Sequence, residues 1–363
     1  MFLEIVMTYH EQAVTFVIPG DLHLTQPGLP NYVAAVQMTE EVNNWIKPDF
    51  VQFIGDNVQD ATESQWRLFD ELRSRLDAPH FALTGDHDIK DDPAANGFRA
   101  RFESTYGAFS IRGFRFLRLD SQQYRPVGFH RDQLEWLRLQ IRDAAIAGER
   151  VVLFQHNYPY QIWEDFDGPG IDEWRAIAAT SPIAAVFCGH THYFQVANDG
   201  RNVVAAVRSI GDPEGGLPGY LIGHVRGDDL AFVYRDLASD PRDDDPIVLT
   251  THPCDVPLAT SPRHIVSGPD RIEARVWSRA TIAESRAAVY DDIVRPLAPV
   301  GDGYFTAVLD PSGLEKGAHR LKVHIVDVEG RVGRCETEFV FDPTRRFTAV
   351  PQTRPIVTST HFC

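Results

Sequence analysis

The stretch FVIPGDLH, residues 16–23, places a short apolar run directly before an aspartate and a histidine. Phe, Val and Ile favour β-strands, and a run without polar alternation is typical of a strand buried on both faces. Four further apolar runs also end at glycine or at a polar residue, namely residues 50–54, 81–83, 151–154 and 183–188. The sequence therefore predicts five buried strands, each followed by a polar segment.

Two of the stretches between the first three runs, residues 32–46 and 63–76, have the apolar spacing and charged faces of helices. This succession of strand and helix predicts a layered α/β domain. In such domains the functional loops gather at the carboxyl ends of the strands. We therefore expect the five polar segments to meet at one edge of a sheet.

Imidazole and carboxylate groups dominate these polar segments, without any thiolate. The residues are Asp21, His23, Asp56, Asp86, His87, His156, His190 and His192. Nitrogen and oxygen donors suit divalent Zn, Fe or Mn, whereas structural zinc sites are rich in cysteine. One catalytic ion takes about three protein ligands, so this set can supply two ions with Asp56 shared. Two such ions form a clamp for in-line displacement at phosphorus.

The order of the motifs resembles that of the calcineurin-like metallophosphoesterases: Asp-x-His, Gly-Asp, Gly-Asn-His-Asp/Glu, His and Gly-His-x-His. The resemblance implies a domain with α/β/β/α layers and in-line attack by a metal-bridging hydroxide. It also implies that His87 contacts the phosphoryl group and helps the leaving oxygen depart, and that Asp88 orients His87. The implied ligands are Asp21, His23, Asp56 and His192 for one metal, and Asp56, Asp86, His156 and His190 for the other.

Three further features resemble the branch that hydrolyses cyclic nucleotides and glycerophosphodiesters. Residues 114–121 read as a strand followed by Leu-Asp-Ser, residues 133–137 open an amphipathic helix, and residues 156–159 give His-x-x-Pro. The resemblance therefore implies a phosphodiesterase that acts on small organic phosphodiesters. Two alternatives stay open. One is a phosphomonoesterase or nucleotide pyrophosphatase on the same centre, and the other is a non-catalytic scaffold that retains the fold.

The third motif departs from the family pattern, because Asp86 stands where asparagine is usual. A carboxylate adds a negative charge, which takes a centre of two divalent ions, Asp21, Asp56 and a hydroxide from about +1 to about neutral. The added charge weakens the pull on an anionic ester and makes bound water less acidic. It also predicts tighter metal binding and a preference for harder ions.

Composition narrows the classes of partner. The chain has 363 residues and a formal net charge of −16, which argues against nucleic acid as a bulk partner. A small phosphorylated substrate drawn to a local metal field remains compatible with this charge. No apolar stretch is long enough to span a bilayer, and residues 1–10 lack the features of a signal peptide, so the sequence predicts a cytoplasmic protein without membrane partners. The four cysteines are widely spaced and form no Cys-x-x-Cys pair.

Pattern changes along the chain divide it into four parts. Residues 1–239 form the predicted metal domain, and residues 240–246 form an acidic linker. Residues 247–343 carry short alternating strands, which predict a β-sandwich of immunoglobulin or fibronectin type with a role in packing or assembly. The Pro-interrupted tail, residues 344–363, either crosses back over the first domain or mediates contacts between subunits, which leaves a homo-oligomer open.

Overall fold

The computed structural model describes residues 12–125, 127–160, 166–214, 216–237, 245–290 and 293–346, together with the backbone of residues 352–357. Most of the predicted acidic linker lies outside this range. Residues 1–10, which were predicted to lack the features of a signal peptide, also lie outside it. In the part that is described, no helix combines the length and the apolar character needed to cross a membrane.

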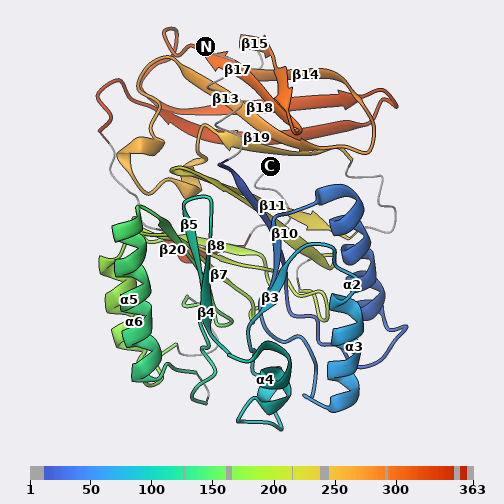
Figure 1. The fold of residues 1–363 in the computed structure, drawn as a ribbon. Coiled ribbons are helices and arrows are strands. Elements are labelled where there is room, and N and C mark those ends of the chain that lie inside the picture. The colour runs from blue at the N-terminus through green and yellow to red at the C-terminus, as the bar shows by residue number, and fades with distance from the viewer. Residues whose placement is uncertain are drawn as a thin grey trace.

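The metal domain contains two β-sheets packed face to face (Figure 1). One sheet has the order β11-β10-β1-β2-β3, and the other has the order β20-β8-β9-β7-β6-β5-β4. The first sheet consists of β1 (Val14–Pro19), β2 (Phe50–Phe53), β3 (His80–Ala82), β10 (Gly219–Arg226) and β11 (Asp229–Asp236). The second consists of β4 (Gly107–Ile111), β5 (Phe114–Arg118), β6 (Arg150–Phe154), β7 (Ile183–Cys188), β8 (Gln195–Asn198), β9 (Val203–Ala206) and β20 (Gln352–Val357).

Helices cover the outer face of each sheet (Figure 1). Met38, Trp66 and Phe69 pack on the first sheet, and Leu137 and Trp174 belong to the core against the second. The helices are α2 (Pro30–Glu41), the π-helical turn η1 (Val42–Ile46), α3 (Glu63–Arg73), the short 3-10 turn η2 (His87–Ile89), α4 (Asn96–Phe102), α5 (Arg131–Ala147) and α6 (Ile171–Thr180). The four layers are thus α/β/β/α, in agreement with the predicted mixed α/β fold.

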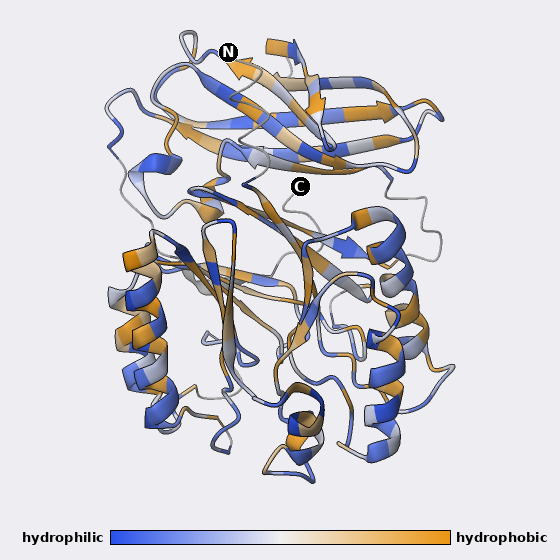
Figure 2. Cartoon of the chain, in the orientation of Figure 1, coloured by the Kyte–Doolittle hydropathy of each residue, from blue (hydrophilic) through white to orange (hydrophobic). Residues whose placement is uncertain are grey.

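Aromatic residues fill the space between the two sheets. Phe16 and Phe50 of the first sheet meet Phe116, Phe154 and Phe187 of the second, all at most 2% exposed. Phe16 stacks on Phe50 with ring centroids 5.4 Å apart and makes edge contacts with the other three rings. Figure 2 shows the same pattern, with hydrophobic strands inside and mixed helices outside. The apolar runs predicted as buried strands therefore form this core.

The expectation that all five motif-bearing strands share one sheet edge is wrong. β1, β2 and β3 belong to the first sheet, whereas β6 and β7 belong to the second. The apolar runs alone do not encode sheet membership, because strand pairing depends on partners that are distant in sequence.

The C-terminal region consists of two four-stranded sheets of antiparallel strands that share one apolar core. Their orders are β12-β13-β17-β16 and β15-β14-β18-β19. The elements are β12 (Ile247–His252), the 3-10 turns η3 (Val256–Leu258) and η4 (Pro262–His264), β13 (Asp270–Trp277), β14 (Ile282–Val289), β15 (Ile293–Pro296), β16 (Ala298–Gly301), β17 (Tyr304–Leu309), β18 (Gly317–Asp327) and β19 (Val332–Phe341). Beyond this region, β20 returns to the metal domain and pairs with β8. Of the two alternatives for the tail, the crossing back over the first domain is therefore observed for residues 352–357.

Candidate metal centre

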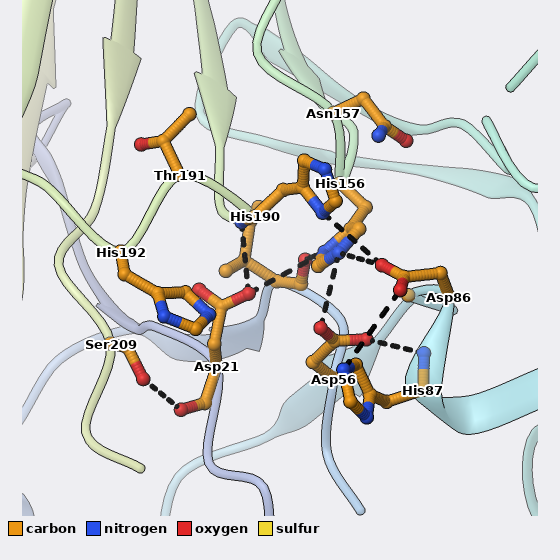
Figure 3. A network of polar contacts seen from close by, with 12 residues as sticks. Asp21, Asp56, Asp86, His87, His156, Asn157, His190, Thr191, His192 and Ser209 are labelled. Carbon is orange, nitrogen blue, oxygen red and sulfur yellow. Dashed lines mark hydrogen bonds and ion pairs between the residues drawn. The ribbon is translucent and has the colours of Figure 1, made fainter. Parts of the chain in front are cut away.

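The polar segments after β1, β2, β3, β6 and β7 converge where the ends of the two sheets meet (Figure 3). All seven predicted ligands fall into two groups whose donor atoms lie within 4.8 Å of one another. The first group is Asp21, His23, Asp56 and His192, and the second is Asp56, Asp86, His156 and His190. Asp56 belongs to both groups, as the sequence predicted.

The first group gathers two imidazoles beside buried carboxylates. Nε2 of His23 lies 3.1 Å from Nε2 of His192 and 3.7 Å from Oδ2 of Asp56. Asp21 is fully buried, and its Oδ1 accepts a hydrogen bond of 2.9 Å from the backbone N–H of His190. That bond links the loop after β1 to the loop after β7, and so joins the two sheets at the site.

The second group is arranged around Oδ1 of Asp86. This oxygen lies 3.3 Å from Nε2 of His156 and 3.1 Å from Nδ1 of His190. Nε2 of His156 also lies 3.5 Å from Oδ2 of Asp56. On the other side of its ring, Nδ1 of His156 is 2.9 Å from the carbonyl oxygen of Ile54. Since a carbonyl only accepts, Nδ1 carries the hydrogen, and Nε2 is left to face the carboxylates and a metal.

Two glycines permit this close approach of loops. A Cβ atom at Gly85 would lie 2.1 Å from Oδ1 of Asp56, and a Cβ at Gly55 would lie 2.4 Å from Nδ1 of His156. Gly55 also has a φ of +100°, a conformation that side chains disfavour. Asp56 itself has a φ of +50°. The turn after β2 is therefore shaped to direct the Asp56 carboxylate into the centre.

The donor set fits a pair of divalent ions. Oδ2 of Asp21 is buried without a hydrogen-bond partner, which is costly for a carboxylate oxygen unless a cation satisfies it. Burial opposes ionisation of Asp56, but the charge and hydrogen bond of His156, together with the charge of His23, outweigh this effect and lower the pKa of Asp56. Burial likewise acts to lower the pKa of His156, yet Asp56, Asp86 and Asp21 together raise it well above its ordinary value. The carboxylates thus favour a positive charge at this place, which a bound cation would supply.

His87 lies beside the ligand groups, and the residue that orients its imidazole ring is not the predicted one. Nδ1 of His87 is 2.8 Å from the carbonyl oxygen of Gln59, so Nδ1 donates to that oxygen, and Nε2 lies 4.0 Å from Oδ2 of Asp86. The backbone N–H of His87 donates to Oδ1 of Asp56 over 2.9 Å. Its ring meets that of His23 edge to face, with centroids 4.6 Å apart. The carbonyl of Gln59 therefore orients this imidazole.

The predicted role of Asp88 as the support of His87 is wrong. Asp88 is fully buried, and its Oδ2 accepts from Asn57 Nδ2 and from the backbone N–H of Gly85, while Oδ1 accepts from that of Val58. Burial and the charge of Asp56 raise the pKa of Asp88 to about 8. Asp88 thus fastens the loop after β3 to the loop after β2. The sequence could not show this, because the pairing joins residues 30 positions apart.

Other residues near the motifs have structural partners. Asn57 donates to the carbonyl of Leu83 and to Asp88, and Tyr158 is fully buried in the core. Ser209 donates to the backbone carbonyl of Asp21, and Asn31 donates to that of His23, each over 2.8 Å. Sequence reasoning missed Ser209 and Asn31, because neither belongs to a motif. Their bonds fix the backbone that carries the first two ligands.

Comparison with protein families gives one match over this part of the chain. Residues 14–194 match the family described as calcineurin-like phosphoesterase. These residues include all the predicted metal ligands and His87.

Individual relatives fall into two classes of activity. The chain is 28% identical over 163 residues to a probable glycerophosphodiester phosphodiesterase, GpdQ, from Arcobacter nitrofigilis, a match that covers 40% of this chain and 57% of that protein. It is 27% identical over 284 residues to human tartrate-resistant acid phosphatase type 5, with 62% of this chain and 85% of that protein covered.

Among solved structures, a dimetal phosphatase from Danio rerio superposes with a TM-score of 0.52 at 13% identity, covering 61% of this chain and 96% of that one. At this low identity the likeness concerns the fold alone.

Proposed function

Because the chain belongs, through residues 14–194, to the calcineurin-like phosphoesterase family, we propose that it is a metal-dependent hydrolase of small organic phosphodiesters. The observation that carries the proposal is the pair of ligand groups that share Asp56, with His87 beside them. Two divalent ions held there would polarise phosphoryl oxygens and activate water. Zn, Fe and Mn all suit these nitrogen and oxygen donors.

His87 supplies the chain's own contribution to the reaction. Because Nδ1 is engaged by the carbonyl of Gln59, only Nε2 can reach a substrate oxygen. The side chain is 28% exposed, which leaves Nε2 accessible from the solvent side of the centre. A donor at this place neutralises charge on the phosphoryl or leaving oxygen as it develops.

Asp86 favours a diester over a monoester as substrate. A monoester carries about −1.5 to −2 charges at neutral pH, whereas a diester carries about −1. Asp86 adds a carboxylate to the second ligand group, so the centre attracts anions less than one with a neutral amide would. The weaker attraction reduces binding of the monoester more than binding of the diester, because the monoester carries more negative charge. The likeness to GpdQ supports the same choice.

A phosphomonoesterase is the second candidate, because the likeness to human tartrate-resistant acid phosphatase covers 62% of this chain. The phosphodiesterase and the phosphomonoesterase are distinguished by measuring kcat/KM on metal-loaded protein, once with bis-p-nitrophenyl phosphate and once with p-nitrophenyl phosphate. We expect the diester to be the better substrate. The reverse preference would favour the monoesterase, and two bound ions without turnover of either ester would favour a scaffold.

A His87→Ala variant tests the assigned site. We expect kcat to fall by roughly 100-fold with unchanged metal content, which is typical of the loss of one charge-stabilising donor. His130→Ala is the matched control, because His130 is exposed at the start of α5. Equal kcat values for both variants would show that His87 takes no part in the reaction.

For the C-terminal sandwich we propose the immunoglobulin type. In chain order, β12 to β19 would be strands A, B, C, C′, D, E, F and G. The observed orders β12-β13-β17-β16 and β15-β14-β18-β19 then read A-B-E-D and C′-C-F-G. Constant-type immunoglobulin domains have A-B-E-D opposite C-F-G, which supports this assignment with β15 as an added strand.

A further inference from the structure

A groove of about 1170 Å³ lies between the edge strand β11 and the sandwich. Its walls are residues 233–236 of β11, residues 246–248 and parts of β14, β18 and β19. Figure 1 shows β19 on the side of the sandwich that faces β11. Among the described residues that line the groove, none belongs to the metal centre. Ligand pockets commonly measure roughly 300–1,000 Å³, so the groove has room for a small organic molecule.

Three basic side chains form a row across the sheet on one wall of this groove. His324 of β18 is paired directly with Arg286 of β14 on one side and with Arg334 of β19 on the other. The next residues along β14 and the preceding one along β18, Ala287 and Val323, are buried in the sandwich core. Because successive side chains of a strand point to opposite faces, the three basic side chains point outward, and all three line the groove. We call these three residues the cationic row.

The cationic row carries charge that nearby carboxylates do not compensate. Within the part of the chain that the structure describes, Arg286 and Arg334 form no ion pair. Two carboxylates also line the groove, but each has a cationic partner outside it: Asp236 pairs with Arg208, and Glu336 pairs with Arg320. The wall therefore presents two guanidinium groups to a ligand.

His324 responds to the positive charge on both sides of it. Partial burial lowers the pKa of His324, the charges of Arg286 and Arg334 lower it further, and Glu284 acts weakly in the other direction. Nδ1 of His324 is also buried without a hydrogen-bond partner among the described residues. Like charges directly opposite one another destabilise a sheet, and such local conflicts are expected mainly at functional sites. An anion in the groove would relieve this conflict.

The spacing of the two guanidinium groups fits a ligand with two anionic ends. Neighbouring strands lie about 4.7–4.9 Å apart, so the backbones of β14 and β19, which flank β18, are roughly 10 Å apart. A guanidinium group binds a phosphoryl group through two parallel hydrogen bonds. A phosphoryl group carries about −1.5 to −2 charges at neutral pH. One phosphoryl group at each guanidinium would therefore neutralise the cationic row.

We propose that this groove is a second ligand site, separate from the metal centre, which binds a small organic molecule through two phosphoryl groups held by Arg286 and Arg334. His324 lies between the two guanidinium groups and faces the middle of the ligand. Beside the cationic row, Val294 is paired with Ala288 and is 46% exposed, which provides apolar surface for the organic part. The proposal does not depend on the proposed hydrolase function, because the two sites share no residue.

Calorimetric titration of the full-length, metal-loaded protein with fructose 1,6-bisphosphate tests the site. We expect Arg286→Gln and Arg334→Gln each to weaken binding by roughly tenfold, because each variant loses a paired contact to a phosphoryl group. Arg295→Gln is the matched control, since Arg295 is an exposed residue of β15 that does not line the groove. This control should bind the bisphosphate as the wild type does. Wild-type affinity in the two groove variants, or an equal loss in the control, would overturn the proposal.

Two further ligands test the chemical class. Fructose 6-phosphate offers one phosphoryl group, and glutarate offers two carboxylates. We expect both to bind at least about tenfold more weakly than the bisphosphate, because each lacks one or both of the phosphoryl contacts. Equal affinity for fructose 6-phosphate would overturn the requirement for two phosphoryl groups. Equal affinity for glutarate would overturn the assignment to phosphoryl groups.

Chemical modification of arginine locates the bound ligand. Phenylglyoxal modifies exposed arginines, and mass spectrometry of peptides reports each position. We expect fructose 1,6-bisphosphate to slow modification of Arg286 and Arg334 but not of Arg295. Binding without this protection would overturn the proposed site. Hydrolysis of bis-p-nitrophenyl phosphate should be unchanged in Arg286→Gln and Arg334→Gln. Absence of turnover in the wild type would overturn the hydrolase function alone, and the protection pattern would still support the groove site.

Discussion

Asp86 places a carboxylate where the family motif usually has an amide, and its two oxygens face different neighbours. Oδ1 lies among the ligand atoms, 3.1 Å from Nδ1 of His190, whereas Oδ2 lies 4.0 Å from Nε2 of His87. Its side chain is 42% exposed, so solvent screens part of its charge. The residue therefore acts on metal binding more strongly than on the overall field of the site.

An Asp86→Asn variant should bind the second ion more weakly and hydrolyse phosphodiesters no slower than the wild type. One charge at about 4 Å from a cation is worth roughly 1–4 kcal/mol between water and a protein surface, so a loss of affinity of at least about fivefold is expected. Titration calorimetry and initial rates measure the two effects. Asp91→Asn removes the same charge from an exposed position and serves as the control. A variant that kept both ions but lost all hydrolysis would contradict the expectation.

At the scale of the element, patterns of apolar residues located the strands and helices but not their irregular ends. The helix predicted over residues 32–46 begins at Pro30 and changes at Val42 into a π-helical turn. This turn lets Val42, Trp45 and Ile46 all face the core. It ends at Lys47, which has a φ of +49°. The wider turn depends on packing against the first sheet, which a helical repeat in the sequence does not contain.

His252, which lies outside the metal motifs, connects three strands at the boundary between the two domains. Its Nδ1 lies 3.1 Å from Asp229 at the start of β11, and its Nε2 lies 3.1 Å from Asp270 at the start of β13. Burial acts to lower the pKa of His252, but hydrogen bonds to both carboxylates raise it from 6.5 to about 9. The folded protein therefore favours the imidazolium form.

Stability should consequently fall at alkaline pH. Because the folded pKa of His252 lies above its ordinary value, its contribution is complete below pH 6.5 and is lost as the pH rises through about 9. The full contribution is at most about 3.4 kcal/mol, at 1.36 kcal/mol for each pKa unit. Urea unfolding at pH 6 and pH 9.5 measures it, with His252→Gln as the variant that does not titrate. If the wild type and His252→Gln lose the same free energy of unfolding between pH 6 and pH 9.5, groups other than His252 cause the loss.

On the scale of the whole molecule, Glu41 connects the two domains. Its carboxylate accepts from Tyr220 of β10 over 2.8 Å and lies 3.1 Å from Nη2 of Arg235 in β11. Arg279 of the sandwich lies 3.8 Å from the same carboxylate. Nearby, Trp277 Nε1 donates to the carbonyl of Ile46. Glu41 and Arg235 are at most 4% exposed, so each needs the other's charge.

A Glu41→Gln variant should lower the free energy of unfolding by about 3–5 kcal/mol, because it removes the charge of Glu41 from its buried ion pair with Arg235. Since Glu41 contacts elements of both domains, we expect a single calorimetric transition that moves to lower temperature. Glu40→Gln changes the exposed neighbouring residue and should be near neutral. Two separate transitions in the wild type would show that the domains unfold independently.

The sequence by itself located the candidate ligands, because the order of its motifs resembles that of a known family and each motif follows an apolar run that local composition marks as a strand. It also located Asp56 as the shared residue. Tertiary structure alone decided that the five strands belong to two sheets, that Gln59 rather than Asp88 orients His87, and that β20 returns to β8. The physical reason is the range of the interactions. Strand formation depends on neighbours in the chain, whereas these pairings join residues that only the packed core and its backbone hydrogen bonds bring together.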